Sequence, residues 1–192
     1  MKREIRILEN VDHPGIVKLY EAIETQTQVF LVMELMEGGS MHSFLKAKPQ
    51  RRLEEKQART FFRQIVSAIA YCHNRCISHR DIKLENILMN EDMSFVKLID
   101  FGFSTCNTPG KPMRLFCGTP SYMAPEIVTK QEFVGAPADI WALGVLMVVI
   151  LSGVFPFKSK ADGELYKQIS TGIYRLPDYI SFQAKSLIMK LL

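Results

Sequence analysis

The sequence predicts an α+β fold with two unequal parts, a short strand-rich start followed by a longer helix-rich remainder. Two β-rich runs, residues 16–23 and 29–35, are joined by a polar connection and therefore predict an antiparallel pair. Apolar side chains then recur at helical spacing up to about residue 76, and helical patterns dominate again from residue 136. Because strands come first, helices follow and no internal repeat is present, we expect strands and helices to segregate.

Each element has a local signal of its own. A short helix is expected over residues 2–11, where apolar side chains recur at helical spacing before His13-Pro14-Gly15 interrupts them. After the two strands, Gly38-Gly39 punctuates the chain, and a long helical stretch follows. Its apolar stripe consists of Phe61, Phe62, Ile65, Ile69 and Cys72. Short strands and loops are expected over residues 77–125.

The composition limits the possible classes of protein. The 192 residues are 47% hydrophobic and 23% charged, which is typical of one globular domain, with room for a small appended lobe. The net charge of +4 is spread along the chain, so the sequence predicts no nucleic-acid partner. The longest apolar run, residues 140–151, has 12 residues, which is too short to cross a bilayer and predicts a buried helix.

The cysteines and the N-terminus bear on the cellular location. The four cysteines stand at positions 72, 76, 106 and 117, without Cys-x-x-Cys spacing. Cys72, His73 and Cys76 share one helical turn, where a metal site stays open although helix packing explains these residues equally well. Residues 1–4 lead straight into an amphipathic pattern, unlike a secretory signal. We expect a reducing, cytoplasmic location, with the nucleus as an alternative.

Candidate catalytic residues are concentrated between positions 79 and 102. Residues 79–86 read His-Arg-Asp-Ile-Lys-Leu-Glu-Asn, and two short apolar strands around a polar turn follow before Asp100-Phe101-Gly102. Two such strands predict a hairpin whose open end brings Asn86 and Asp100 together. An amide oxygen and a carboxylate at one place are suited to Mg²⁺.

Asp81 and Lys83 complete this group of residues. Asp81 lies five residues before Asn86, close enough to receive a proton from a hydroxyl beside the metal. Lys83 adds a positive charge where a transferred phosphoryl group needs one. Turn and cap chemistry also favours Asp and Asn and is the simpler alternative. Independent turns do not require this ordered set, so we favour a phosphoryl-transfer site.

The ordered motifs resemble those of the eukaryotic protein kinase family. His79-Arg80-Asp81 with Asn86, then Asp100-Phe101-Gly102 and Ala124-Pro125-Glu126, stand in the order of that family. The resemblance covers essentially the whole chain and implies a bilobal fold. Residues 1–36 would be an incomplete small β-rich lobe, with the regulatory helix, two strands and the hinge. Residues 37–192 would be the mostly helical large lobe, ending inside a late helix.

The resemblance also implies ATP and Mg²⁺ as cofactors and a set of site residues. Asp81 would be the catalytic base, Lys83 the γ-phosphate contact, and Asn86 and Asp100 the metal ligands. The ATP pocket would consist of Met33 as gatekeeper, Glu34 and Met36 in the hinge, Leu88 under the adenine, and Asp100. Glu4 matches the regulatory-helix glutamate, and the hydrophobic column that couples the lobes would be Leu8, Leu19, His79 and Phe101.

Two features are similar to one branch of the family. Lys83 and the Gly-Thr-Pro-Ser-Tyr-Met run at residues 118–123 resemble Ser/Thr kinases, which implies protein substrates with Ser or Thr acceptors. Leu84, together with the Asp-Phe-Gly-Phe-Ser run at residues 100–104, is similar to the calmodulin-dependent and AMP-activated group. Glu85 favours a basic residue near the acceptor, whereas Ser40 replaces an acidic residue that often helps, so the preferred substrate sequence stays open.

The sequence also departs from the family pattern. No Gly-x-Gly-x-x-Gly and no Val-Ala-x-Lys strand precede Glu4, so the resemblance implies a domain truncated at both ends whose 192 residues bind ATP weakly and transfer little phosphate. A pseudokinase-like binding module is the alternative. Leu115 replaces the Thr that many members phosphorylate, so we expect activity not to need a phosphate there. Thr105, Thr108 and Thr119 are other candidate phosphorylation sites.

Overall fold

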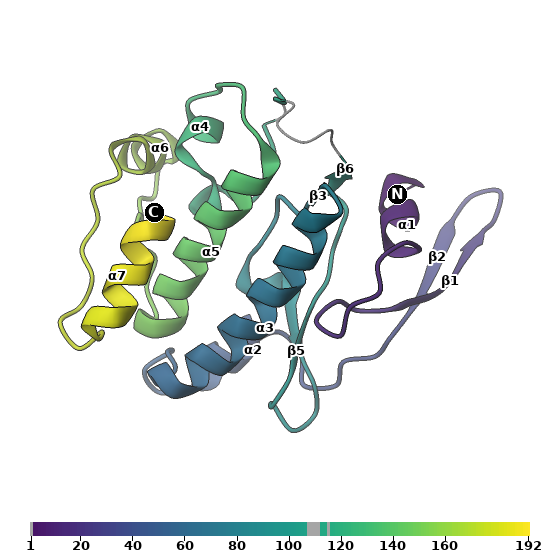
Figure 1. Cartoon of the computed structure of the whole chain (residues 1–192), viewed down its shortest axis with the longest axis horizontal. Helices are drawn as coiled ribbons and strands as arrows, with labels where there is room; N and C mark the ends of the chain where they lie inside the picture. Colours follow the sequence, from purple (N-terminus) through teal and green to yellow (C-terminus); the bar gives the residue numbers. More distant parts are fainter. Residues whose placement is uncertain (1, 107–111, 115) are drawn as a thin grey trace.

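The larger part of the molecule is built around one long central helix. The computed structural model describes residues 2–106, 112–114 and 116–192. Helix α5 (Gly135–Ser152) runs through the centre, with α3 (Glu55–Asn74) on one side and α7 (Phe182–Leu191) on the other (Figure 1). A Cβ added to Gly144 of α5 would lie 2.9 Å from the Cβ of Leu191, so the close approach of the C-terminal segment favours glycine there.

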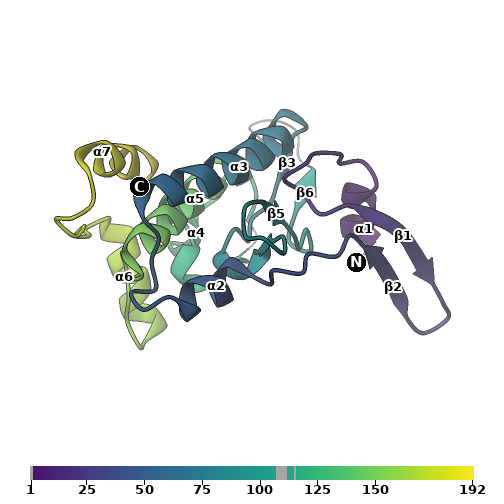
Figure 2. The same ribbon diagram turned by 90° about the horizontal axis from the view of Figure 1, so that it is seen from below.

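Short elements surround these helices and confirm the predicted α+β fold. In chain order they are α1 (Lys2–Leu8), β1 (Leu19–Glu24), β2 (Val29–Met33), α2 (Met41–Ala47), β3 (Ile77–Ser78), a 3₁₀ turn at Leu84–Asn86, β4 (Ile87–Met89), β5 (Val96–Leu98), β6 (Thr105–Cys106), a 3₁₀ turn at Pro120–Tyr122, α4 (Pro125–Val128) and α6 (Asp162–Thr171). Helix α1 and the antiparallel β1–β2 pair lie at one end of the molecule (Figure 2). The predicted division at residue 36 stays a prediction.

Helix α5 has 18 residues and is apolar enough to cross a membrane by length and composition. It is therefore longer than the 12-residue apolar run at residues 140–151 from which the sequence predicted a helix too short to do so. Its 18-residue apolar window is 78% buried against the rest of the described chain. Side chains buried around the whole circumference are what the core helix of a globular domain shows. The predicted buried helix is therefore confirmed, with wider bounds.

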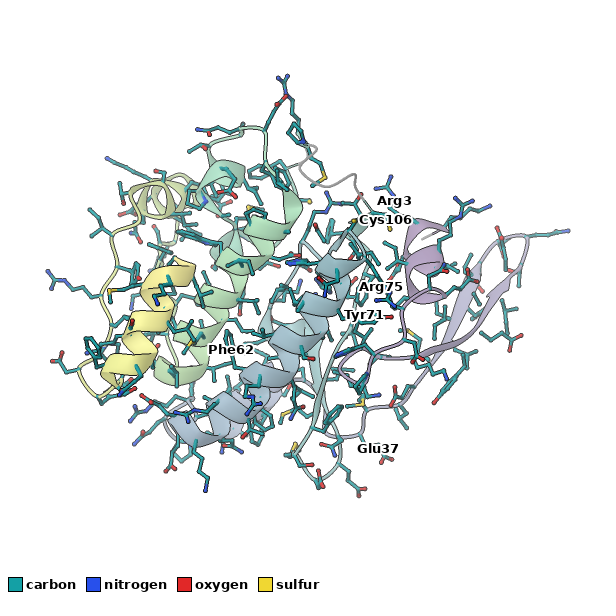
Figure 3. All side chains as sticks on the ribbon, in the orientation of Figure 1. Arg3, Glu37, Phe62, Tyr71, Arg75 and Cys106 are labelled. Carbon is teal, nitrogen blue, oxygen red and sulfur yellow. The ribbon has the colours of Figure 1, made fainter. Side chains whose placement is uncertain are left out.

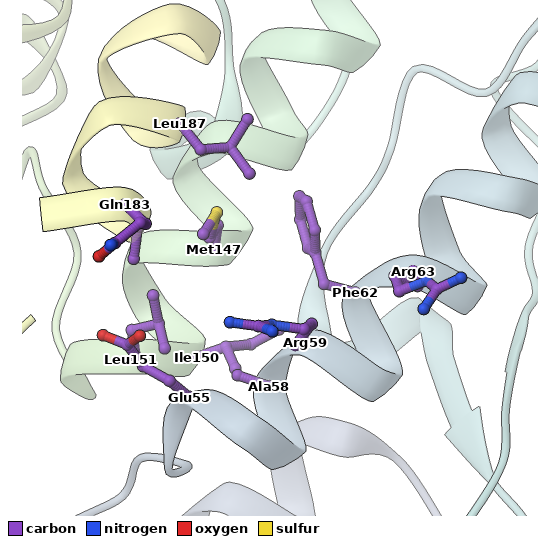
Figure 4. A pocket seen from close by; sticks show the side chains of 11 residues that line it. Glu55, Ala58, Arg59, Phe62, Arg63, Met147, Ile150, Leu151, Gln183 and Leu187 are labelled. Atoms are coloured by element: carbon purple, nitrogen blue, oxygen red, sulfur yellow. The ribbon is translucent and has the colours of Figure 1, made fainter. Parts of the chain in front are cut away.

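The helices around α5 leave one apolar cavity of about 210 Å³ between α3, α5 and α7. Phe62, Met147 and Leu187 point into it from the three helices, and Arg59 lies at its edge (Figure 4). Cys72 of α3 is fully buried, and burial raises the pKa of its thiol to about 12. Among the residues that the structure describes, no group of three His, Cys, Asp or Glu side chains could hold a metal, which supports packing for Cys72.

The long helical stretch expected up to about residue 76 is divided into α2 and α3. Ser40 caps α2 by accepting a hydrogen bond from the Ser43 N–H at 3.2 Å. Residues 48–54 leave the helix because Pro49 cannot donate a main-chain hydrogen bond and Arg51 has a left-handed φ of 52°. The Leu53 N–H instead bonds the Ile150 carbonyl of α5 at 2.9 Å.

The first predicted strand begins later than expected. Ile16 forms a parallel bridge with Leu98 of β5, and the Val17 N–H donates to the Leu98 carbonyl at 3.1 Å. The chain reaches β1 only at Leu19. Residues 16 and 17 therefore belong to the hairpin that carries the candidate catalytic residues, because their apolar side chains are buried against the core there.

The β4–β5 hairpin lies between two further extended segments. Residues 15–17 pair with β5, and the Gly38 N–H donates to the Met89 carbonyl of β4 at 3.0 Å. A Cβ at Gly38 would collide with the Asn90 carbonyl, so the segment that follows β2 approaches β4 closely only as glycine. This pairing on both sides fixes the hairpin between the two ends of the molecule.

The loop after α1 is joined to α3 through aromatic and polar contacts. His13 Nδ1 accepts from the Gly15 N–H at 2.9 Å, and His13 Nε2 lies 3.0 Å from Ser67 Oγ. The His13 ring contacts Tyr71 at 5.0 Å between centroids, and Arg75 covers the Tyr71 ring at 3.9 Å (Figure 3). Burial lowers the pKa of His13, which favours the neutral ring in the folded chain.

A pH-dependent stability follows from His13. Below about pH 6.5, His13 takes up a proton in the unfolded chain but not yet in the folded chain. The free energy of unfolding therefore decreases as the pH is lowered, until the pH reaches the lower pKa of His13 in the folded chain. Asn at position 13 offers an acceptor that does not titrate. In the full-length protein, His13→Asn is expected to reduce the loss of melting temperature between about pH 7.5 and about pH 5.5. The exposed His42→Asn is the matched control, and an unchanged pH profile in His13→Asn would contradict the assignment.

Candidate active site

The Asp81 carboxylate is held by three side chains. Asp81 lies between β3 and the Leu84–Asn86 turn and is only 3% exposed. Its Oδ2 accepts from Lys83 Nζ at 2.6 Å and from Asn86 Nδ2 at 3.1 Å. Its Oδ1 accepts from Thr119 Oγ1 at 2.8 Å. The three residues predicted to be catalytic therefore lie in direct contact.

These donors leave one acceptor position on Asp81. A carboxylate offers about four lone-pair positions, and the three donors occupy two at Oδ2 and one at Oδ1. Thr119 also accepts from Lys83 Nζ at 3.1 Å, which closes the ring of contacts. Sequence reasoning treated Thr119 only as part of a motif and as a candidate phosphorylation site. One acceptor position at Oδ1 therefore takes no donor from the described residues, on a carboxylate whose side chain is 1% exposed.

Asn86 and Asp100 lie at the open end of the β4–β5 hairpin, as expected. The Ile99 N–H donates to the Asn86 carbonyl at 2.9 Å, so the two chain segments are paired just before Asp100. Asp100 has a left-handed φ of 63°, and its Oδ1 accepts from the Gly102 N–H at 3.1 Å. In the described part of the chain, Asn86 Oδ1 and Asp100 Oδ2 accept no hydrogen bond. Two such free oxygen atoms fit a hard cation such as Mg²⁺.

A buried carboxylate on α5, that of Asp139, orients the segment that leads to Asp81 by accepting from its main chain. Asp139 is 1% exposed and accepts from the His79 N–H at 2.8 Å and the Arg80 N–H at 2.7 Å. His73 Nε2 lies 2.8 Å from Asp139 Oδ2. Arg80, with a φ of 67°, is held in a strained conformation immediately before Asp81. Sequence reasoning gave no sign of this role for Asp139.

Comparison with known proteins agrees with this geometry. The model of the protein kinase domain family matches residues 1–192. The chain belongs to the protein kinase domain family. The expected resemblance is thus confirmed, and so is the kinase-like α+β fold.

Two curated relatives indicate the branch. This kinase domain is 42% identical over 192 residues to "Probable serine/threonine-protein kinase MARK-A" of Dictyostelium discoideum, covering 100% of the chain and 18% of that relative. It is 43% identical over 177 residues to "NUAK family SNF1-like kinase 2" of Rattus norvegicus, covering 92% of the chain and 28% of that relative. The chain thus spans less than a third of either relative. Their names confirm the resemblance to Ser/Thr kinases of the AMP-activated type.

The residues of the predicted hydrophobic column are packed in the core of the kinase domain. The rings of His79 and Phe101 are 4.9 Å apart, edge to face, and both side chains are fully buried. Leu8 is buried in the same cluster, and Leu19 packs against it. Burial lowers the pKa of His79, which keeps its ring neutral. The contacts agree with a packing role for His79.

Glu4 lies beside the Asp-Phe-Gly turn. Its Oε2 is 3.8 Å from the position of a Cβ built on Gly102. Burial, and then the negative charge of Asp100, raise the pKa of Glu4. A cation between these two carboxylates would reverse the shift. The regulatory-helix role that the family resemblance implies for Glu4 stays a prediction.

The predicted ATP-pocket residues lie along the segment from the end of β2 to residue 40 and on β4, which this segment contacts. Met33 ends β2, Glu34 and Met36 lie in the segment after it, and Ser40 at the end of that segment bridges to Leu88 of β4. The Glu34 carboxylate is paired with Lys97 Nζ at 2.6 Å, and the Lys97 side chain is only 16% exposed. The cause is the pairing of residues 15–17 with β5, which brings the two side chains together. Burial raises the pKa of Glu34, but the hydrogen bonds and charges of Lys97 and Lys18 together outweigh it, so the net shift is downward.

Arg80 bonds to the residue that follows Asp100-Phe101-Gly102. Its Nε donates to the Phe103 carbonyl at 2.6 Å, and its Nη2 donates to the same oxygen. The guanidinium therefore has a partner within the kinase domain. Leu115, at which we expect no phosphate, and Thr108 lie outside the described residues.

Proposed function

We propose that the full-length protein transfers the γ-phosphoryl group of ATP to Ser or Thr hydroxyls of protein substrates, with Mg²⁺ as cofactor. The observation that carries the proposal is the Asp81 carboxylate, which three internal donors orient and which keeps one free acceptor position at Oδ1. The names of the two relatives, both kinases, support the same class of reaction.

Asp81 and Lys83 divide the chemistry between them. The substrate hydroxyl donates to Asp81 Oδ1, which takes the proton as the hydroxyl oxygen bonds to phosphorus and the bond from phosphorus to the ADP oxygen breaks. Lys83 lies within hydrogen-bond distance of Asp81 and Thr119, where its charge stabilises the transferred phosphoryl group. Thr119 holds the two side chains together, because its hydroxyl accepts from Lys83 and donates to Asp81.

Asn86 and Asp100 would hold Mg²⁺ through their free oxygen atoms. The ion would neutralise charge on the phosphate oxygens of the substrate. Met33, Met36 and Leu88 would contact the adenine, and Glu34 would contribute its main chain, because its side chain is paired with Lys97. These assignments rest on the family resemblance together with the arrangement of the free oxygen atoms.

The test uses the full-length protein with labelled ATP and Mg²⁺. Peptides with Ser or Thr acceptors should be labelled, whereas the same peptides with Tyr should not. Asp100→Ala should raise the Mg²⁺ concentration for half-maximal rate by at least about tenfold, because it removes a metal ligand. Asp92→Ala, in the exposed β4–β5 turn, is the matched control. Labelling on Tyr alone would sink the proposal, and ATP or peptide binding without any transfer would favour the pseudokinase-like binding module.

A further inference from the structure

The carboxylate of Glu34 joins three segments of the chain. Its Oε1 lies 2.6 Å from Lys97 Nζ, and its Oε2 accepts from the same nitrogen at 2.7 Å. Oε2 also accepts from the Lys18 N–H at 3.2 Å, and the Glu34 N–H donates to the Lys18 carbonyl at 2.9 Å. The start of residues 34–40, which connect β2 to α2, is therefore bound to β5 and to the residue before β1 (Figure 2).

This ion pair is better covered than one at the surface of the molecule. The side chains of Glu34 and Lys97 are 24% and 16% exposed, whereas those of Glu24 and Lys2 are 64% and 81% exposed. Water screens such a covered pair less, so the attraction between its charges is stronger. The Phe95 ring lies 5.9 Å from Lys97 Nζ, at the limit of a cation–π contact, which makes Glu34 the main partner of Lys97.

Lys97 is fixed relative to one side of the proposed nucleotide site. In the β4–β5 hairpin it is the cross-strand partner of Leu88, the residue proposed to lie under the adenine. Opposite residues of an antiparallel pair carry their side chains on the same face of the sheet. Lys97 also comes three residues before Asp100, the proposed metal ligand. A group that binds Lys97 is therefore held at a set position relative to Leu88.

Glu34 belongs to the other side of the same site. It follows Met33, which ends β2 and is also proposed to contact the adenine. The later part of residues 34–40 is bound to the hairpin through the main chain, because the Gly38 N–H donates to the Met89 carbonyl at 3.0 Å. At the beginning of this connection, the bond to the hairpin is made by the Glu34 side chain.

We propose that the ion pair of Glu34 and Lys97 positions the two sides of the nucleotide site relative to each other and so sets the affinity for ATP. It keeps the main chain of Glu34 at a fixed distance from Leu88 before the nucleotide arrives, and a site ordered in advance loses less entropy on binding. Neither charged side chain touches the nucleotide in this role, so both are positioning groups. The inference rests on the proposed function and deepens its nucleotide site.

The experiment uses the full-length protein with Mg²⁺, ATP and a peptide that carries a Ser or Thr acceptor. Lys97→Met removes the charge and keeps a side chain of similar length. We expect the KM and the Kd for ATP to rise by roughly threefold to tenfold, as the loss of a partly buried ion pair would give. The kcat and the KM for the peptide should change by less than about twofold, because the Asp81 carboxylate keeps its donors.

Two further variants separate positioning from a general loss of stability. Glu34→Lys and Lys97→Glu each place two like charges together, whereas the combined variant exchanges the charges and restores a pair. The combined variant should bind ATP at least about threefold more tightly than either single variant. Lys185→Met is the matched control, because it removes the partly buried lysine that pairs with Asp178 on the other side of the molecule. It should leave the Kd for ATP unchanged even where it lowers the melting temperature.

ATP binding measured by calorimetry without peptide distinguishes this inference from the proposed function. If ATP binds but no peptide is phosphorylated, the proposed function fails, while the Kd values of the variants still decide the inference. An unchanged Kd for ATP in Lys97→Met would overturn it, as would a combined variant that binds no better than the single ones. The same holds if Lys185→Met weakens ATP binding as much as Lys97→Met. A wild-type protein that binds no ATP would overturn both the inference and the proposed function.

Discussion

Asp81→Asn in the full-length protein is expected to lower the rate of phosphoryl transfer by at least about a hundredfold. An amide cannot take the proton of the substrate hydroxyl. It also carries one acceptor oxygen, so its NH₂ group must face Thr119 on one side or Lys83 and Asn86 on the other. Both the proton transfer and the arrangement of the donors are lost together.

Single-turnover transfer with saturating ATP isolates this step. The affinity for ATP should change by less than about threefold, because Asp81 is not among the residues proposed to hold the nucleotide or the metal. Thr119→Ser keeps the hydroxyl that donates to Asp81 and should retain most of the rate, whereas Thr119→Ala should lose part of it. Transfer by Asp81→Asn within threefold of the wild-type rate would rule out Asp81 as the base.

The sequence predicted the parts of the site that depend on neighbouring residues. Asn86 and Asp100 are adjacent because two short apolar strands around a polar turn form a hairpin, and that pattern is local. Asp81, Lys83 and Asn86 are close because they are within five residues of one another in one turn. The buried character of α5 was likewise visible in its continuous apolar run.

The contacts missed by sequence reasoning join distant segments. Thr119 reaches Asp81 from 38 residues away, and Asp139 reaches His79 from 60 residues away. No periodicity or spacing relates such pairs, because packing of whole elements brings them together. The ion pair of Glu34 and Lys97 has the same cause, since it spans 63 residues. Local propensity also failed at residues 16 and 17, where tertiary pairing with β5 decided the strand.

Asp139→Ala should destabilise the kinase domain by about 3–5 kcal/mol. The substitution removes the acceptor of two buried main-chain donors, the N–H groups of His79 and Arg80, and the partner of His73. A buried donor without an acceptor costs about 1–3 kcal/mol, and no water-filled replacement is expected beside a side chain that is only 1% exposed. Arg80, with its left-handed φ of 67°, would also lose the bond that maintains this conformation.

Denaturant unfolding of the full-length protein measures the loss of stability. Hydrogen exchange of the peptide that contains His79 and Arg80 measures the loss of the bonds to their N–H groups. The free energy of unfolding of Asp139→Asn should lie between those of Asp139→Ala and the wild-type protein. The amide oxygen of Asn still accepts a hydrogen bond, but its NH₂ group faces a donor. Asp162→Ala, an exposed carboxylate in the first turn of α6, is the control and should cost less than about 1 kcal/mol. The two amides should exchange faster in Asp139→Ala even under conditions in which the domain stays folded, because the lost bonds are local to this turn. Unchanged protection of both amides, together with a stability loss below about 1 kcal/mol, would show that Asp139 does not support the catalytic segment.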